Sequence, residues 1–287
     1  MALSRYTTLG TGGQARWFDT PETVDELVAR LAWLEAEGLP VAVVGLGSNM
    51  LVADEGFPGV VLKLSGDLAA AEAVDGTLAA GGGAPLAVCL HRARGAELGG
   101  IEFVCAIPGT VGGGVWMNAG AYGGDIASVL TRALVAEGSG AAWQTPAQLG
   151  LRYRASALRH GQVVASAEFA LEPRALDEIK ATVSALQAQR KAAQPTNKRT
   201  FGSVFKNPEH ELTAGRMLEA CGLRGFAIGG AQISPKHANF IENAGEARSA
   251  DAIALIAEAR RRAREQFGVV LQPEVQLLGA LEIPAVG

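Results

Sequence analysis

Two glycine-rich segments contain residue types that could hold a phosphorylated ligand through the main chain. The first, VVGLGSN (residues 43–49), follows a short apolar run. Residue 50, where the GxGxxG dinucleotide fingerprint needs its third glycine, is Met50, and an apolar strand rather than a helix follows. A strand–loop–strand turn can instead point successive N–H groups at an anion, with Ser48 and Asn49 adding side-chain donors. The segment indicates a phosphate-binding turn outside the Rossmann class, or else an ordinary tight turn.

The second segment, AIPGTVGGGVWMNAGAYGG (residues 106–124), has no charged side chain. A loop of this composition suits close wrapping around a large flat ligand, with main-chain groups forming the hydrogen bonds. It lacks the GxxxxGK[ST] pattern of a phosphate-binding P-loop, and a glycine-rich turn within a β-structure is the alternative. Pro108 and the glycines exclude a membrane span, because such backbone would lack hydrogen-bond partners in lipid. We expect a buried loop system over residues 103–124, with no helix.

Charge and cysteine content exclude several classes of protein. The formal net charge of −4 argues against a nucleic-acid binder, which would present a basic face. The chain starts without the apolar region of a signal peptide. We therefore expect a cytoplasmic protein that binds neither nucleic acid nor membrane. The three cysteines and four histidines have no metal-ligand or disulfide spacing, so we predict no metal site and interpret the cysteines as small core residues: Cys89, Cys105 and Cys221.

Taken together, several motifs resemble one flavoprotein family. VGLGSNMLV (44–52) and IPGTVGGGVWMNAGAYGG (107–124) look like the FAD-binding lobe of the UDP-N-acetylenolpyruvoylglucosamine reductase family, whose superfamily includes vanillyl-alcohol oxidase. The resemblance continues, in the family's order, through the segments YR (153–154), GSVFKNP (202–208), GGAQIS (229–234), KHANFI (236–241) and QPEV (272–275). Chain length and the KHANFI segment resemble the shorter class, which lacks a tyrosine-bearing loop over the substrate.

The resemblance implies an NADPH-dependent oxidoreductase that acts on a C=C bond. Hydride would pass from NADPH to non-covalently bound FAD, and then from flavin N5 to the enolpyruvyl ether of UDP-N-acetylglucosamine enolpyruvate. The product would be UDP-N-acetylmuramate for peptidoglycan, which implies roles in cell-wall biogenesis, cell shape, cell cycle and cell division. We expect a monomer.

The resemblance also implies three catalytic residues. Arg154 and Glu274 would hold the enolate-like intermediate, with Glu274 donating a hydrogen bond in its protonated form. Ser203 would give a proton to the adjacent carbon. Considered without the motifs, Arg154 could form a surface ion pair, Glu274 could be a solvated charge at a strand end, and Ser203 could be a turn residue. Gln276 stands where the family usually has a basic residue, which puts a cationic contact to the substrate from that position in doubt.

The remaining site residues implied by the resemblance bind cofactor or substrate. Those for FAD are Gly45, Gly47, Ser48, Asn49, Met50, Gly109, Thr110, Gly112, Gly113, Asn118, Gly120 and Gly123. Those for the substrate are Tyr153, Lys198, Asn207, Gln232 and His237, and the basic side chains of Lys191 and Arg199 are further candidates for its diphosphate.

Two other functions stay open at this point. The chain could be another FAD-dependent oxidase or dehydrogenase on the same scaffold. A covalent flavin link needs histidine or cysteine in a cofactor loop; neither glycine-rich segment contains histidine, but Cys105 lies just before the second. A catalytically silent nucleotide-binding protein is the other alternative, and the joint presence of Ser203, Arg154 and Glu274 argues against it.

Periodicity predicts a mixed set of elements to position these residues. A helix capped by Thr20, with Pro21 at its first position, should run to Gly38. Strands are predicted at 40–44, 50–52 and 60–64, which gives a β-α-β beginning. Further strands are predicted at 77–80, 129–135, 163–171 and 269–278, and further helices at 85–94, 176–191 and 249–267.

The predicted fold class is α+β, with a two-lobed FAD-binding domain of the vanillyl-alcohol oxidase type and a smaller α+β substrate domain. We place the first FAD-binding lobe at 1–66, the second at 67–194 and the substrate domain at 195–287. The polar, proline-containing segment QPTNKR (194–199) favours the second boundary, and the C-terminal tail could return to the first lobe.

Overall fold

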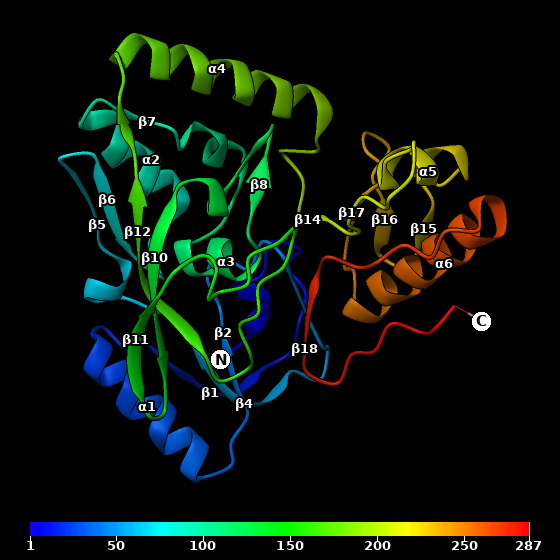
Figure 1. The fold of residues 1–287 in the computed structure, drawn as a ribbon. Coiled ribbons are helices and arrows are strands. Elements are labelled where there is room, and N and C mark those ends of the chain that lie inside the picture. The colour runs from blue at the N-terminus through cyan, green and yellow to red at the C-terminus, as the bar shows by residue number, and fades with distance from the viewer. Residues whose placement is uncertain (287) are drawn as a thin grey trace. The chain divides into compact units, whose positions relative to one another are not determined.

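The structure is a computed structural model that describes residues 1–286, and it divides the chain into two compact units (Figure 1). Unit 1 contains residues 1–16, 47–58 and the chain from Lys191 onward, whereas unit 2 contains residues 17–46 and 59–190. Helices occur together with mainly antiparallel sheets in both units, so the α+β prediction is confirmed. The division into two FAD-binding lobes and a substrate domain concerns which part binds which ligand, and it stays a prediction.

Unit 2 is built around a five-stranded antiparallel sheet in the order β11-β10-β12-β6-β5. Helices α2 (Leu86–Gly95) and α3 (Val111–Trp116) pack on one face, and α1 (Val24–Ala36) contacts β10 and β11. The strands are β5 (Ala71–Val74), β6 (Thr77–Gly81), β10 (Leu130–Glu137), β11 (Gly140–Gln144) and β12 (Val163–Ala170).

Alternate residues of the central strands feed two hydrophobic clusters. Ala133 and Val135 of β10 join the larger cluster with α2, α3 and the long helix α4 (Leu176–Ala193). Ala136, the residue after Val135 in β10, joins the smaller cluster with α1. This alternation is the two-residue period of a strand that is buried on both faces.

The other strands of this part of the chain are short. A three-stranded sheet has the order β1-β4-β2, with β2 and β4 parallel. Two-stranded pairs join β7 with β13 and β8 with β9. The bounds are β1 (Ala15–Asp19), β2 (Val41–Val43), β4 (Phe57–Leu62), β7 (Leu98–Gly99), β8 (Gly120–Ala121), β9 (Gly124–Asp125) and β13 (Glu172–Pro173).

The prediction that residues 103–124 contain no helix is wrong. The 3-10 helix η3 (Glu102–Ala106) covers its start, and α3 occupies its middle. Glycine is a poor helix former in isolation, but here it permits close packing: a Cβ at Gly112 would lie 3.0 Å from the main-chain oxygen of Gly82. Tertiary packing therefore outweighs propensity in α3.

Helix α1 begins later than predicted. Thr23, not Thr20, is its N-cap, and the Thr23 hydroxyl accepts a hydrogen bond from the Glu26 N–H at 3.2 Å. Glu26 Oε2 accepts in turn from the Glu22 N–H at 2.9 Å. The Thr-x-x-Glu spacing of a capping box thus prevails over the Thr-Pro signal three residues earlier.

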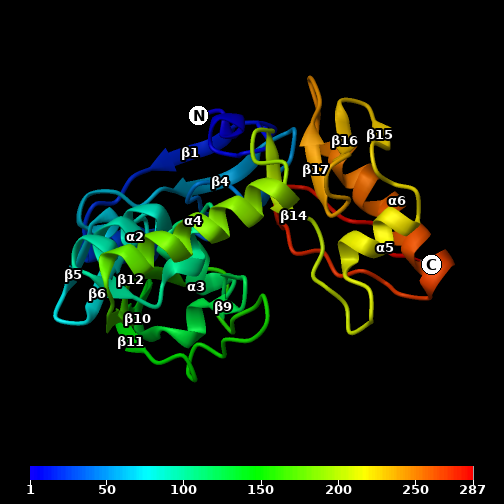
Figure 2. The same cartoon turned by 90° about the horizontal axis from the view of Figure 1, so that it is seen from above.

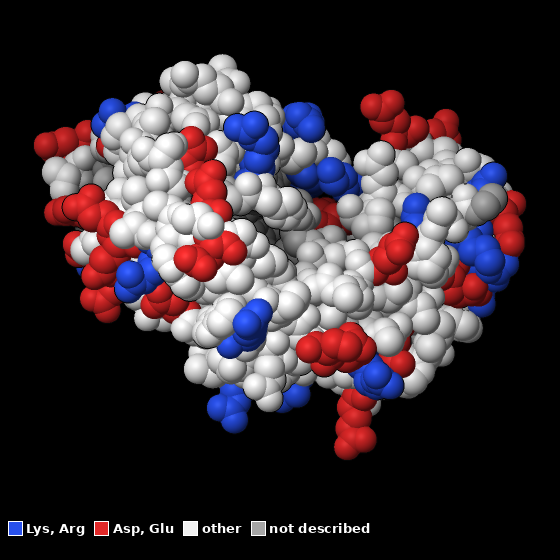
Figure 3. Space-filling view, turned by 90° about the horizontal axis from the view of Figure 1, so that it is seen from below, with Lys and Arg blue, Asp and Glu red and all other residues white. Residues whose placement is uncertain are grey.

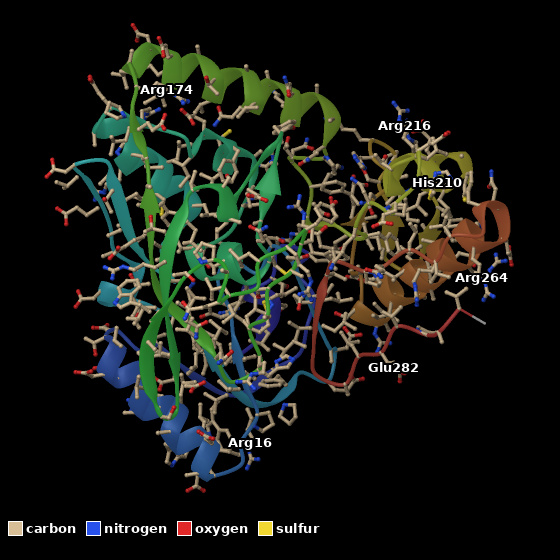
Figure 4. The ribbon with its side chains drawn as sticks, viewed as in Figure 1. Arg16, Arg174, His210, Arg216, Arg264 and Glu282 are labelled. Atoms are coloured by element: carbon tan, nitrogen blue, oxygen red, sulfur yellow. The ribbon has the colours of Figure 1, made fainter. Side chains whose placement is uncertain are left out.

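A partly buried ion pair forms just before the start of α4, at Arg174, which is labelled in Figure 4. Glu102 is 5% exposed, and its Oε1 accepts from Arg174 Nη1 at 2.7 Å. Its Oε2 accepts from the Gly100 N–H at 2.8 Å. Because both carboxylate oxygens have partners, Glu102 serves the packing of unit 2 and is no candidate for catalysis.

Unit 1 contains a four-stranded antiparallel sheet in the order β14-β17-β16-β15 (Figure 2). Helices α5 (Ala214–Ala220) and α6 (Ser249–Phe267) share one hydrophobic cluster with this sheet. The strands are β14 (Thr200–Ser203), β15 (Ala227–Ile228), β16 (Ala231–Ile233) and β17 (Phe240–Asn243).

The C-terminal strand of unit 1 is shorter than predicted. Only β18 (Gln276–Leu278) is a strand within the segment 269–278, and it pairs in parallel with β3 (Met50–Val52). The N-terminal side of the segment instead supplies isolated main-chain contacts, such as the bridge between Pro273 and Phe205.

Asp54 caps α6 from a distant point in the sequence. The N-cap residue is Arg248, whose side chain has no hydrogen-bond acceptor, so the exposed N–H groups of the first turn need another partner. Asp54 Oδ1 accepts from the Ser249 N–H at 2.9 Å and Oδ2 accepts from the Ala250 N–H at 3.1 Å. The Ser249 hydroxyl also donates to the Val52 main-chain oxygen at 2.6 Å. This network joins β3 to α6.

We expect Asp54→Ala to lower the free energy of unfolding by about 1–2 kcal/mol, the usual cost of losing a helix cap. Urea unfolding followed by circular dichroism measures this change. Glu55→Ala is the control, because Glu55 is exposed and has no role in the cap. Equal effects of the two substitutions would contradict the capping role.

Candidate active site

A β-bulge at Gly202 sets the orientation of Ser203. In β14, Thr200 pairs with Glu242 and Ser203 pairs with Phe240, so three residue steps on one strand match two on the other. Gly202 takes the left-handed φ of +81° within this irregularity. Because Glu242 and Phe240 lie on one face of β17, Thr200 and Ser203 share that face. In a regular strand Ser203 would instead follow Phe201 into the core.

The segment 272–274 lies beside residues 204–206, which directly follow β14. The Glu274 N–H donates to the Val204 main-chain oxygen at 2.7 Å, and the Lys206 N–H donates to the Gln272 oxygen at 2.9 Å. Two of the three predicted catalytic residues, Ser203 and Glu274, are therefore brought together within unit 1, although 71 positions separate them in the sequence.

The first glycine-rich turn contacts the same part of unit 1. Asn49 Nδ2 donates to the Glu274 main-chain oxygen at 3.2 Å, and the Asn49 oxygen accepts from the Gln276 N–H at 2.9 Å. A Cβ at Gly202 would lie 3.4 Å from the Ser48 oxygen. Gln276 Nε2 also donates to the Glu274 oxygen, at 3.1 Å. The predicted cofactor residues Ser48 and Asn49 are thus neighbours of Ser203 and Glu274.

Asn239 clamps the chain just after Ser203, and sequence reasoning did not assign it to the site. Its Oδ1 accepts from the Phe205 N–H at 3.0 Å, and its Nδ2 donates to the Phe205 oxygen at 2.8 Å. Its main-chain oxygen accepts from the Val204 N–H at 2.9 Å. Asn239 is 4% exposed, and the only signal for it was its place in the KHANFI motif.

His237 is held as a neutral imidazole near this clamp. Its Nδ1 accepts from the Asn239 N–H at 3.1 Å, which places the ring proton on Nε2 in the neutral form. Burial lowers the pKa of His237 below its ordinary value, and the positive charge of Arg224 lowers it further. The ring also meets that of Phe240 edge-on, with centroids 4.9 Å apart.

We expect stability to fall when the pH drops below the ordinary histidine pKa of about 6.5. The folded state holds the proton of His237 less tightly than the unfolded state, so acid favours unfolding. Above that value the contribution of His237 is complete, and it is lost as the pH falls through the lowered folded-state pKa. Urea unfolding between pH 5 and 8 measures the slope, and His237→Asn should reduce it.

In unit 2, the two glycine-rich segments approach each other at Gly45 and Thr110. A Cβ at Gly45 would lie 2.5 Å from Thr110 Oγ1, so only glycine permits this approach. Lys63 Nζ donates to the Gly45 oxygen at 3.3 Å, which brings a cation to the same point. No pattern in the sequence marks Lys63, because its neighbourhood depends on the pairing of β2 with β4.

Arg154 is fixed by the end of the second glycine-rich segment. Its Nη2 donates to the Gly120 oxygen at 2.5 Å, and Asn118 Nδ2 donates to the Arg152 oxygen at 3.3 Å. Arg154, Asn118 and Tyr122 all have positive φ, at 52°, 40° and 52°. Such backbone is costly for residues other than glycine and concentrates at functional sites.

The other predicted site residues differ in whether their side chains already form hydrogen bonds within the protein. Asn118 also accepts from the Ala127 N–H at 2.9 Å, so its side chain serves the protein. Asn207 Oδ1 accepts from the Ala214 N–H at 3.1 Å, and Gln232 Nε2 donates to the Gly225 oxygen at 2.9 Å. The more accessible residues are Tyr153 and Lys198, which are exposed, and Gly109, Gly113 and Gly123, where a Cβ would meet no atom closer than 3.7 Å.

The cysteines differ from one another in burial, and their pKa values bear on a covalent flavin link. Cys89 is fully buried as predicted, whereas Cys105 and Cys221 are only partly buried. Burial raises the pKa of Cys89 to about 12, and burial also raises the pKa of Cys105. A thiol in this state is a weak nucleophile, which argues against Cys105 as a point of attachment.

The charged side chains on the face seen in Figure 3 are of both signs. Figure 3 shows basic and acidic side chains interspersed on one face of the molecule. Within residues 1–286, no three histidine, cysteine, aspartate or glutamate side chains are grouped so as to hold a metal ion. In the same range, no helix is both long and apolar enough to cross a bilayer.

Comparison with known proteins identifies the family. Residues 15–145 match the model of the FAD binding domain, and residues 194–278 match that of the UDP-N-acetylenolpyruvoylglucosamine reductase C-terminal domain. The reductase of Sphingopyxis alaskensis is 44% identical over 95% of this chain and 91% of its own length. This chain belongs to the UDP-N-acetylenolpyruvoylglucosamine reductase family.

Further members of the reductase family support this assignment. The Syntrophotalea carbinolica reductase is 41% identical over 96% of this chain and 92% of its own length. The crystal structure of the reductase from Thermus caldophilus has a TM-score of 0.84 and 36% identity, and it covers 97% of this chain and 98% of that chain. The predicted membership of the family and the predicted FAD-binding domain are confirmed.

Proposed function

We propose that this protein reduces UDP-N-acetylglucosamine enolpyruvate to UDP-N-acetylmuramate with NADPH and FAD, in peptidoglycan synthesis. The observation that carries the proposal is the identity of 44% to a UDP-N-acetylenolpyruvoylglucosamine reductase over nearly the whole chain. The side chains that this chemistry needs are present at the matching positions: a hydroxyl at Ser203, a guanidinium at Arg154 and a carboxyl at Glu274.

The residues of the two glycine-rich segments suit FAD. The close approach at Gly45 and Thr110 brings the two segments together, and Lys63 supplies a positive charge there. Main-chain groups at Gly109, Gly113 and Gly123 have space beside them. When bound, FAD supplies hydride transfer from NADPH to the substrate, chemistry that no side chain can perform.

Ser203 has the role of proton donor to the carbon next to the one that receives hydride. Its hydroxyl is a weak acid, so the protein must hold it in a fixed direction. The bulge at Gly202, the clamp by Asn239 and the hydrogen bond from Glu274 to Val204 each restrict the main chain around it. Three independent restraints on one residue support this role.

Arg154 and Glu274 have the role of stabilising the negative charge that develops on the pyruvyl carboxylate. Donors fixed before the reaction are effective because they need no reorganisation, and each contributes roughly 3–4 kcal/mol. The Arg154 guanidinium is held in this way by the Gly120 oxygen. The main chain of Glu274 is held by its bonds to the Val204 oxygen and the Asn49 side chain.

Binding of the sugar nucleotide is assigned to Tyr153, Lys198, Asn207, Gln232 and His237. Arg224, which acts on His237 electrostatically, is a further cation for the diphosphate. The proposal places the protein in the cytoplasm, because its substrate and NADPH are soluble metabolites, and takes it to act as a monomer. Roles in cell shape, cell cycle and cell division follow from the supply of cell-wall precursor.

Two half-reactions in the absence of oxygen test the proposal. Purified protein should absorb near 450 nm, and NADPH should bleach this absorbance. Addition of the enolpyruvyl sugar nucleotide should restore it with formation of the lactyl ether. Bleaching without recovery would leave an NADPH-dependent flavoprotein with another acceptor, and it would refute the substrate assignment.

A further inference from the structure

A row of polar side chains crosses the sheet of unit 1 on the same face as Ser203. Glu242 of β17 pairs with Thr200 of β14 on one side and with Gln232 of β16 on the other. Residues paired directly across antiparallel strands share a face. The opposite face carries Phe201, Ile233 and Ile241, which belong to the hydrophobic cluster with α5 and α6.

Two members of this row lack hydrogen-bond partners. Glu242 is 5% exposed, and no hydrogen bond or ion pair reaches its carboxylate from residues 1–286. Thr200 Oγ1 is the one buried side-chain nitrogen or oxygen atom in that range without a partner. Gln232 uses its amide N–H for Gly225. The carboxylate oxygens of Glu242 are not among the buried unpartnered atoms, so the end of this side chain is accessible. Buried polar groups are normally satisfied, so Thr200 Oγ1, beside that accessible carboxylate, indicates that a group from outside the protein completes the row.

The chemistry of that group follows from the carboxylate. An ionised carboxylate accepts hydrogen bonds and donates none, and it repels phosphate. Its partner is therefore a hydroxyl or an amide N–H. Because the end of the carboxylate is accessible, such a donor can reach it from outside the protein.

The distance between Glu242 and Ser203 indicates that the sugar ring of the substrate is the partner of Glu242. Glu242 is two residues from Phe240, the partner of Ser203, and two residues of strand span about 7 Å. In the proposed function Ser203 meets the enolpyruvyl group, which is an ether of the amino sugar. The ring substituents beside that ether, a hydroxyl and an acetamido N–H, lie within a few bonds of it.

We propose that Glu242 is a specificity-determining residue that accepts a hydrogen bond from a hydroxyl or acetamido N–H of the substrate's sugar, with Thr200 beside it. The inference rests on the proposed function. It adds a contact between the β14–β17–β16 face and the sugar ring.

Steady-state kinetics of Glu242→Ala test this contact. The KM for the enolpyruvyl sugar nucleotide should rise roughly 10- to 100-fold, the range expected for one lost hydrogen bond to a charged group. The rate of flavin reduction by NADPH should stay within about twofold of the wild type, because that half-reaction does not involve the sugar. Glu246→Gln, which changes an exposed carboxylate on the same unit, is the control and should leave the KM unchanged.

Thermal unfolding separates this role from a structural one. Glu242→Met keeps the side-chain volume and removes an accessible carboxylate that bonds to no group within residues 1–286, so the Tm without substrate should not fall. The increase in Tm on adding the sugar nucleotide should be smaller than in the wild type. A lower Tm, or an unchanged KM in Glu242→Ala, would overturn the inference. If wild-type flavin is not reoxidised by the nucleotide, the proposed function itself fails.

Discussion

Replacement of Ser203 by alanine should leave flavin reduction by NADPH intact and slow reoxidation by the enolpyruvyl nucleotide by about 10²- to 10⁴-fold. This range is the usual contribution of a positioned proton donor. Ser203 lies on the polar face of β14 because of the bulge at Gly202, and the substitution leaves the clamp by Asn239 in place. Anaerobic stopped-flow absorbance near 450 nm measures the two half-reactions separately.

Two further variants make the result specific to the hydroxyl. Ser203→Thr keeps a hydroxyl on the same strand and should retain part of the reoxidation rate. Ser139→Ala removes an exposed hydroxyl that bonds only to Glu137, and it should have no effect on either step. Reoxidation of the Ser203→Ala protein at the wild-type rate would exclude the proton-donor role.

Replacement of Gly47 by alanine should yield protein with little or no FAD and a strongly lowered stability. Gly47 has a φ of +63°, and a Cβ there would lie 1.8 Å from the main-chain oxygen of Tyr6. The left-handed backbone costs an L-residue about 1–2 kcal/mol, and overpacking costs about 1–3 kcal/mol more. Relief of the contact must move the turn that carries Ser48 and Asn49, since the Gly47 oxygen also accepts from the Thr8 N–H at 3.1 Å.

Gly38→Ala is a close control for this substitution. Gly38 has nearly the same φ, +61°, but no atom lies within 4 Å of the position that a Cβ would take. The free energy of unfolding of this variant should fall only by the backbone cost of about 1–2 kcal/mol, and the variant should keep its full FAD content. The ratio of flavin to protein absorbance and the Tm distinguish the two variants. Equal flavin content in both would refute the importance of the turn at Gly47.

The sequence predicted most of the regular elements, because their signals are local. The helix predicted at 249–267 matches α6, and the strand predicted at 50–52 matches β3. Both follow from hydrophobic periodicity, which neighbouring residues determine. The errors occurred where tertiary contacts prevailed. Helix α3 forms despite its glycines. The segment predicted as a strand at 269–278 instead makes single main-chain hydrogen bonds to the residues that follow β14.

The identity of the candidate site residues came from the order of motifs along the chain, and their geometry did not. The spacing of GSVFKNP and QPEV gives no sign that Glu274 bonds to Val204, because that contact depends on the path of the 69 residues between them. The capping of α6 by Asp54 is equally invisible in the sequence, since its partners are 195 and 196 positions away.

The sequence by itself determined the family, the FAD-binding segments and the residue types available for chemistry. Those properties depend on which side chains occur and in what order. The tertiary structure alone decided that Ser203 faces away from the core, that Thr110 meets Gly45, and that Glu242 lies beside the unpartnered hydroxyl of Thr200. Each of these depends on a bulge, a close approach or a strand pairing between distant segments, and the local sequence does not indicate such contacts.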